Sequence, residues 1–205
     1  MASDTTNSKL AELERLKSRV AELEGELQAR PPAWEAKEFY TAYYATAGFM
    51  LGMFGAVTSL LFNVVGSAFV EQSPLRLIQV YLTFPLGERA LQLDDGLTLT
   101  IGCCLYLGTG MLLGVPFHVL LSWFTRDKSF GYRLVVGSLL AVSMWIGHFY
   151  LVLSWLQPLL FGGNWIVELI PAWVGALTHL VYGWTMVLVY PLGEYIPYRR
   201  QTEQA

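Results

Sequence analysis

The sequence predicts an all-α protein, a four-helix transmembrane bundle that follows an N-terminal cytoplasmic amphipathic or coiled-coil helix. The first observation is that four long stretches contain no Lys, Arg, Asp or Glu, and a helix needs only about 20 apolar residues to cross a bilayer. These stretches are residues 39–70, 96–125, 134–167 and 169–193. The second observation is the clustering of charge. The chain has 13 basic and 16 acidic side chains, and 14 of these charged groups lie in residues 1–42.

Residues 8–29 are predicted to form the amphipathic helix. Apolar residues recur there at alternating spacings of three and four, which is the seam of a coiled coil; they are Leu13, Leu16, Val20, Leu23 and Leu27. In a parallel dimer, Glu12 would face Lys17 of the second helix and Arg19 would face Glu24. The alternative is a single amphipathic helix that lies on the membrane or on a partner subunit.

Two prolines, Pro31 and Pro32, are expected to end this helix, so residues 1–33 form the first predicted domain. The membrane domain is predicted over residues 34–198, and residues 199–205 form a short cytoplasmic tail. The four membrane spans are expected at about 43–70, 97–124, 133–156 and 172–190.

Small residues mark the expected contacts between spans. Gly48 and Gly52 in the first span, and Gly110 and Gly114 in the second, are each four apart, a spacing that lets membrane helices approach closely. Asn63 is the most polar residue of the first span, and we expect it to hydrogen-bond to another helix.

The distribution of basic residues predicts the orientation. Arg126, Lys128 and Arg133 lie between the second and third spans, whereas the segment between the third and fourth spans has no basic residue. The positive-inside rule therefore places both termini in the cytoplasm, most simply of a bacterial plasma (inner) membrane. The first 33 residues are polar and do not resemble a signal peptide, so the first span is expected to act as an uncleaved insertion signal.

Two apolar segments on the outer side, residues 74–85 and 158–171, are too short to cross the bilayer. We expect them to form interfacial helices or shallow re-entrant pieces that cover the outer ends of the bundle.

All three histidines lie inside predicted spans, where ionisable residues are costly and face protein or water. From the rise per residue, His148 and His179 fall at a similar depth, about 5 Å to the outer side of the midplane, and His118 falls about 10 Å to the cytoplasmic side. The simplest interpretation is neutral histidines that hydrogen-bond within the bundle and hold no cofactor.

The alternative is a haem b site. Two imidazoles from facing helices at one depth are what a low-spin haem needs, so His148 and His179 would be the axial ligands and His118 a neighbouring residue or a quinone contact. Gly147, Gly175 and Gly183 would leave room for the flat ring.

No residue pattern indicates catalysis. Hydrolase, kinase, phosphate-loop and metalloprotease signatures are absent, and no basic patch suggests nucleic acid. Cys103 and Cys104 are adjacent and too few for a metal site or a disulfide framework. These observations argue against an enzyme, and we expect no catalytic residue.

The leading hypothesis is a non-catalytic membrane subunit that scaffolds or stabilises a larger membrane complex, in contact with lipid and with other subunits or further copies of itself. The alternatives are a bis-histidine cytochrome subunit and a small oligomeric transport or pore protein.

Overall fold

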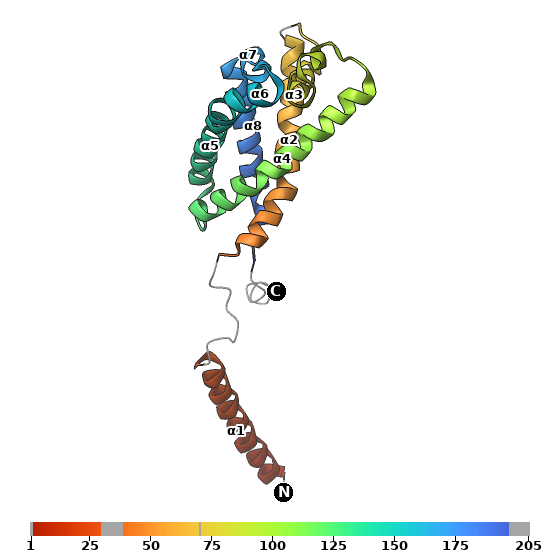
Figure 1. The fold of residues 1–205 in the computed structure, drawn as a ribbon. Helices are drawn as coiled ribbons and strands as arrows, with labels where there is room; N and C mark the ends of the chain where they lie inside the picture. Colours follow the sequence, from red (N-terminus) through yellow and green to blue (C-terminus); the bar gives the residue numbers. More distant parts are fainter. Residues whose placement is uncertain (1, 30–38, 70, 197–205) are drawn as a thin grey trace. The chain divides into compact units, whose positions relative to one another are not determined.

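The computed structural model describes residues 2–29, 39–69 and 71–196, and within these ranges every regular element is helical. The chain divides into two compact units, Met1–Phe39 and Tyr40–Ala205. The first contains a single helix and the second contains all the others (Figure 1). The predicted all-α class with a separate N-terminal helix is confirmed.

Helix α1 spans Ala2–Ala29 and begins earlier than residue 8. Its described side chains are all exposed, including those of the predicted seam. Leu13, Leu16, Val20 and Leu23 are 41–58% exposed, and Leu27 lies outside the residues whose side chains are described. Within its own unit, no described residue covers the apolar face of this helix.

Four helical runs of the second unit are long and apolar enough to cross a membrane, as predicted. They are Thr41–Phe69, Gly96–Thr125, Phe130–Phe161 and Ala172–Gly193. The first two are helices α2 (Thr41–Phe69) and α4 (Gly96–Thr125), and the fourth joins α8 (Ala172–Val189) to the short turn η3 (Tyr190–Gly193).

The third run is longer than the predicted 133–156 and is not uniform. It consists of α5 (Phe130–Ile146), a π-helical segment η2 (Gly147–Leu153) and α6 (Ser154–Phe161). Ser129 begins the run because its side chain accepts a hydrogen bond from the backbone N–H of Tyr132, and Gly162 ends it in a left-handed conformation with φ of 81°.

Helices α2 and α4 pack at very close range along the predicted glycines (Figure 1). A Cβ atom on Gly52 would lie 2.5 Å from the carbonyl oxygen of Gly110 and 3.0 Å from Cα of Gly114, and one on Gly48 would lie 2.7 Å from Cβ of His118. Only glycine permits this approach, since any side chain would meet backbone atoms of the other helix.

The core of the second unit lies where α2, α4, α5 and α8 meet. Its buried apolar residues are Leu51, Ala56, Phe117, Leu121, Ala141, Tyr182, Met186, Val187 and Tyr190. Asn63 adds the expected polar link between helices, because its Nδ2 lies 3.0 Å from the hydroxyl oxygen of Thr178 on α8.

The two short apolar segments form helices that pack on the bundle. Helix α3 (Arg76–Leu86) continues into the 3₁₀ turn η1 (Gly87–Gln92), and α7 (Trp165–Leu169) precedes α8. The fully buried Gln157 links them to α6: its Nε2 donates to the Thr83 hydroxyl at 2.9 Å and its Oε1 accepts from the Ile166 N–H at 3.1 Å.

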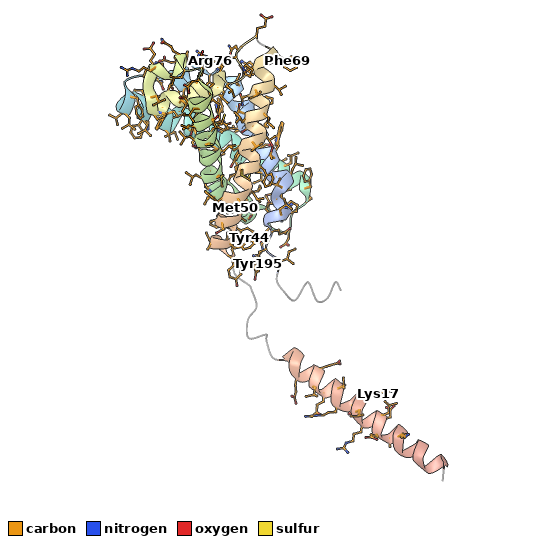
Figure 2. All side chains as sticks on the ribbon, turned by 90° about the vertical axis from the view of Figure 1, so that its right-hand side faces the viewer. Lys17, Tyr44, Met50, Phe69, Arg76 and Tyr195 are labelled. Carbon is orange, nitrogen blue, oxygen red and sulfur yellow. The ribbon has the colours of Figure 1, made fainter. Side chains whose placement is uncertain are left out.

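Aromatic residues gather at one end of the second unit. The ring centroids of Tyr43 and Tyr195 are 5.2 Å apart, and those of Tyr40 and Tyr195 are 5.1 Å apart. Figure 2 shows Tyr44 and Tyr195 at this end of the unit and Phe69 and Arg76 at the opposite end. Helix α2 therefore runs the full length of the unit.

Candidate functional site

A cavity of about 470 Å³ lies inside the second unit, bordered by α2, α3, α4, α8 and the third run. Helices α4 and α5 meet at the turn 126–129 and diverge away from it (Figure 1). Leu105 and Val152, which line the cavity from these two runs, are 47% and 39% exposed. The cavity volume is in the range of pockets that bind small molecules.

The wall of the cavity is mainly apolar and carries no charged side chain among the residues that line it. Its polar side chains come from every bordering run; they are Ser59, Tyr81, Tyr106, Thr109, His148, Thr178, His179 and Tyr182. Such a wall suits a ligand that is mostly apolar and has few polar atoms.

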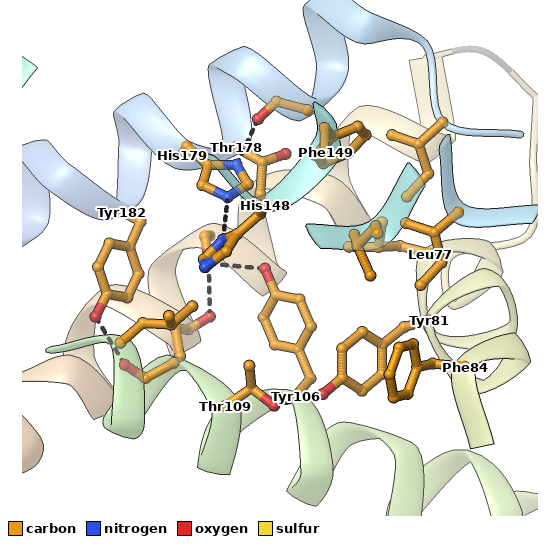
Figure 3. A pocket seen from close by; sticks show the side chains of 18 of the residues that line it. Leu77, Tyr81, Phe84, Tyr106, Thr109, His148, Phe149, Thr178, His179 and Tyr182 are labelled. Atoms are coloured by element: carbon orange, nitrogen blue, oxygen red, sulfur yellow. Dashed lines mark hydrogen bonds between the residues drawn. The ribbon is translucent and has the colours of Figure 1, made fainter. Parts of the chain in front are cut away.

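The two histidines of the predicted pair meet at this wall. Nδ1 of His148 lies 3.4 Å from Nε2 of His179, with ring centroids 5.6 Å apart (Figure 3). The other ring nitrogen of His179, Nδ1, lies 2.8 Å from the carbonyl oxygen of Gly175, one turn earlier on α8.

These contacts define the tautomer of each ring. No acidic side chain lines the cavity to stabilise a positive charge, so both rings are neutral in the apolar interior. The Gly175 carbonyl can only accept, and His179 therefore carries its proton on Nδ1 and accepts at Nε2. His148 must then donate from Nδ1, which leaves an unprotonated Nε2 with a free lone pair.

The π-helical segment presents His148 to the cavity. Within η2, the residues His148, Phe149, Val152 and Leu153 all line the cavity wall. A π-helical turn widens the backbone spiral and changes which side chains share a face, and such turns are frequent at functional sites.

The hydroxyl groups of the wall donate their hydrogens to protein atoms. Ser59 donates to the carbonyl oxygen of Ala56 at 3.0 Å, so the hydroxyl of Tyr106, 3.0 Å from Ser59 Oγ, must be the donor in that pair. Tyr182 donates to the carbonyl oxygen of Gly110 at 2.7 Å (Figure 3).

The remaining hydroxyls follow the same pattern. The Leu105 carbonyl oxygen lies 3.0 Å from the Thr109 hydroxyl and 3.3 Å from the Tyr81 hydroxyl, and the two hydroxyl oxygens are 2.5 Å apart. Both hydroxyl hydrogens therefore have acceptors within this group. Thr178 donates to the Val174 carbonyl oxygen at 2.8 Å. The wall thus offers lone pairs to a ligand, and no described hydroxyl on it has a spare hydrogen to donate.

His118 does not join the pair. It is fully buried, with Nε2 3.4 Å from the carbonyl oxygen of Gly193, and its ring packs 5.9 Å from Tyr44 and 5.4 Å from Tyr190. None of these residues lines the cavity. His118 belongs to the contact between α2, α4 and η3, and it is not a neighbour of the His148–His179 pair.

The histidine pair, as arranged, does not fit a bis-histidine haem. A metal–imidazole bond is about 2 Å long, so two axial nitrogens stand about 4 Å apart with the flat ring system between them. Here the two nitrogens are joined to each other by a hydrogen bond, which leaves no gap for a macrocycle.

The glycines expected to make room for the ring do not open a slot either. The space beside Gly175 is taken by Trp145 and Phe149, and the space beside Gly183 is taken by Ala141 and Phe117; Gly147 faces open space. Among the residues that the structure describes, no group of three or more His, Cys, Asp or Glu side chains is placed to hold a metal ion.

Sequence reasoning paired the two histidines but missed the rest of the wall. In the sequence, Tyr81, Tyr106 and Tyr182 resemble ordinary apolar or interfacial aromatics, and only their position beside the histidines reveals their hydroxyls as part of one site. No family model matches this chain, and comparisons with curated proteins and with solved structures find no match.

Proposed function

We propose that the protein is a non-catalytic, multi-pass membrane subunit that assembles with further copies of itself through a parallel coiled coil of α1. The observation that carries this proposal is the apolar stripe of Leu13, Leu16, Val20 and Leu23, which is exposed along α1. An exposed, regularly spaced stripe of this kind is typical of a helix that is completed by a partner helix.

The energetics favour association over an isolated helix. Burial of a leucine or valine side chain contributes about 1.5–3 kcal/mol, and each chain of a dimer would bury several of them. Most of the stability of a helix in a protein comes from packing of its amphipathic face rather than from helix propensity. Attachment to a membrane domain raises the local concentration of α1 and favours pairing further.

The charges favour a second copy in parallel orientation. Within one chain, Lys17 pairs with Glu14 at 3.1 Å and Arg19 pairs with Glu22 at 2.5 Å, and all four side chains are more than half exposed. Exposed pairs of this kind contribute little, so the lysine and arginine can turn toward the partner helix. There they would meet Glu12 and Glu24 with complementary charge.

The test compares two double variants of the full-length protein in mild detergent. Val20→Asp/Leu23→Asp places two charges in the seam, and Ser18→Asp/Ala21→Asp places two charges on the opposite face. We expect cross-linked or sedimenting dimers for the wild type and for the Ser18/Ala21 variant, and monomers for the Val20/Leu23 variant. Equal association of the two variants, or a monomeric wild type, would contradict the proposal.

The cytochrome and pore alternatives stay predictions with their own direct tests. A reduced-minus-oxidised absorption spectrum of protein from native membranes would show a Soret band that is lost in His148→Ala if haem b were bound. Solute flux in liposomes would reveal a pore. The hydrogen-bonded histidine pair favours neither alternative.

A further inference from the structure

We propose that the cavity binds a lipid-soluble alcohol or phenol, with the ligand hydroxyl donating a hydrogen bond to Nε2 of His148. This is a site for a small apolar molecule that carries one hydrogen-bond donor. It is independent of the coiled coil of α1, because every residue that forms it lies in the second unit.

The first step of the argument is the free lone pair. The Gly175 carbonyl sets the tautomer of His179, and His179 in turn sets that of His148, so the exposed acceptor at the cavity wall is His148 Nε2. This nitrogen has no hydrogen-bond partner among the residues that the structure describes. An acceptor that faces an apolar cavity without a partner leaves a hydrogen bond unmade, and a ligand that donates to it forms that bond.

The second step is the lack of spare donors on the wall. The hydroxyls of Ser59, Tyr106 and Tyr182 already donate to protein acceptors, as do those of the other three hydroxyl residues. A ligand whose only polar atom is a carbonyl or ether oxygen would find no hydrogen to accept. The wall therefore selects for a hydroxyl over the matching ketone or ether.

The third step is the apolar remainder of the cavity. Leu77, Phe84, Leu113 and Ile170 belong to a lining that is otherwise aliphatic or aromatic, and it reaches the exposed surface at Leu105 and Val152. An apolar body or tail can occupy this space and extend toward lipid. The ligand is thus an amphiphile with its hydroxyl inside the protein and its apolar part toward the bilayer.

The test uses a matched pair of probes, 4-nonylphenol and its methyl ether, 4-nonylanisole. Both have the same body and an oxygen, but only the phenol can donate a hydrogen bond. Binding to the full-length protein in lipid nanodiscs is followed by quenching of tryptophan fluorescence. We expect the wild type to bind the phenol about 3- to 10-fold more tightly than the ether, the effect of one buried hydrogen bond.

Two variants separate the hydroxyl contact from the cavity itself. The double variant His148→Phe/His179→Phe keeps rings of similar size and removes both imidazole acceptors, because His148→Phe alone would free Nε2 of His179; the two probes should then bind equally. Val152→Trp places a large ring in the lining of the cavity and should weaken both probes by the same factor. Equal binding of the probes to wild type, or a phenol preference that survives in the double variant, would overturn the proposal, as would the absence of binding by either probe.

A measurement on the wild-type protein tests the same hydrogen bond without any substitution, so it does not depend on how the variants fold. The chain has only three histidines, so ¹⁵N labelling of histidine gives few imidazole signals to assign. The unprotonated Nε2 of His148 should shift upfield when the phenol is added and stay in place with the ether. An unchanged signal in the presence of bound phenol would place the hydroxyl elsewhere and refute the assignment.

Discussion

Gly52 has only a hydrogen atom where other residues carry a side chain, and this lets helix α2 lie directly against helix α4. A methyl group there would lie 2.5 Å from the carbonyl oxygen of Gly110, on a backbone that cannot turn aside. The α2–α4 contact therefore depends on the absence of side chains at the crossing. Interfaces of this kind gain their stability from close packing, since lipid supplies no hydrophobic force between helices.

We predict that Gly52→Ala lowers the free energy of unfolding by about 1–3 kcal/mol, the usual cost of overpacking a tight contact. Gly66→Ala is the matched control, because a methyl group on Gly66, in the same helix, would meet no atom within 4 Å. It should be neutral or slightly stabilising, since alanine is the better helix former. Unfolding in mixed detergent micelles measures both, and equal losses would contradict this account.

The roles of individual residues could be predicted where they depend on spacing along a single helix. The spacing of Gly48 and Gly52, or of Gly110 and Gly114, is visible in the sequence because it repeats within one helix. The shared depth of His148 and His179 was likewise visible from counting. The hydrogen bond between them was not, because it depends on the rotation of α8 against η2, which spacing alone does not define.

At the scale of elements, helix α4 begins at a charged cap. The carboxylate of Asp95 accepts a hydrogen bond from the backbone N–H of Thr98 at 2.9 Å. This bond holds the pKa of Asp95 below its usual value of 3.8, since the charged form is the better acceptor. The contribution of the cap is therefore fully present above pH 3.8 and is lost as the pH falls through the lower pKa of the folded state.

We predict that acid weakens the wild type more than Asp95→Asn, because an asparagine cap accepts the same hydrogen bond without titrating. At neutral pH the wild type should be at least as stable as the variant, and the difference should shrink as the carboxylate is protonated. Thermal unfolding of the two proteins across this range measures the difference. A gap that stays constant with pH would show that Asp95 does not cap α4.

The elements themselves followed the sequence closely, with two informative differences. The third run extends past the predicted end at residue 156 to Phe161, although Pro158 lies within it, and it ends at Gly162 in the left-handed conformation. Its π-helical segment, Gly147–Leu153, has no signature in the spacing of the sequence. The short helix at residues 76–86 was predictable from the length and apolar content of residues 74–85.

At the scale of the whole molecule, the prediction that can be tested is orientation. Basic residues cluster at the turn between α4 and α5, which the positive-inside rule assigns to the cytoplasm. The turn η1 between α3 and α4 then lies on the outer side. Lys128 in the first turn and Glu88 in the second are both exposed, so each can carry a reporter.

We predict that, in a Cys103→Ser/Cys104→Ser background, Glu88→Cys is labelled from outside intact cells by a membrane-impermeant maleimide. Lys128→Cys should be labelled only after the membrane is permeabilised. The two sites serve as controls for each other, because they lie at opposite ends of the same helix. Labelling in the reverse order would show that the bundle has the opposite orientation, with both termini outside the cell.

The exposure of Leu105 and Val152, which line the cavity, has a consequence for how the proposed site would fill. Both residues lie on candidate membrane spans, so a lipid-soluble ligand of the proposed site would reach it from the bilayer rather than from the surrounding buffer. Occupancy then depends on the mole fraction of ligand among the lipids. Diluting a proteoliposome sample with water leaves that mole fraction nearly unchanged for a strongly partitioning molecule. Adding empty vesicles lowers the mole fraction and therefore lowers the occupancy of the site.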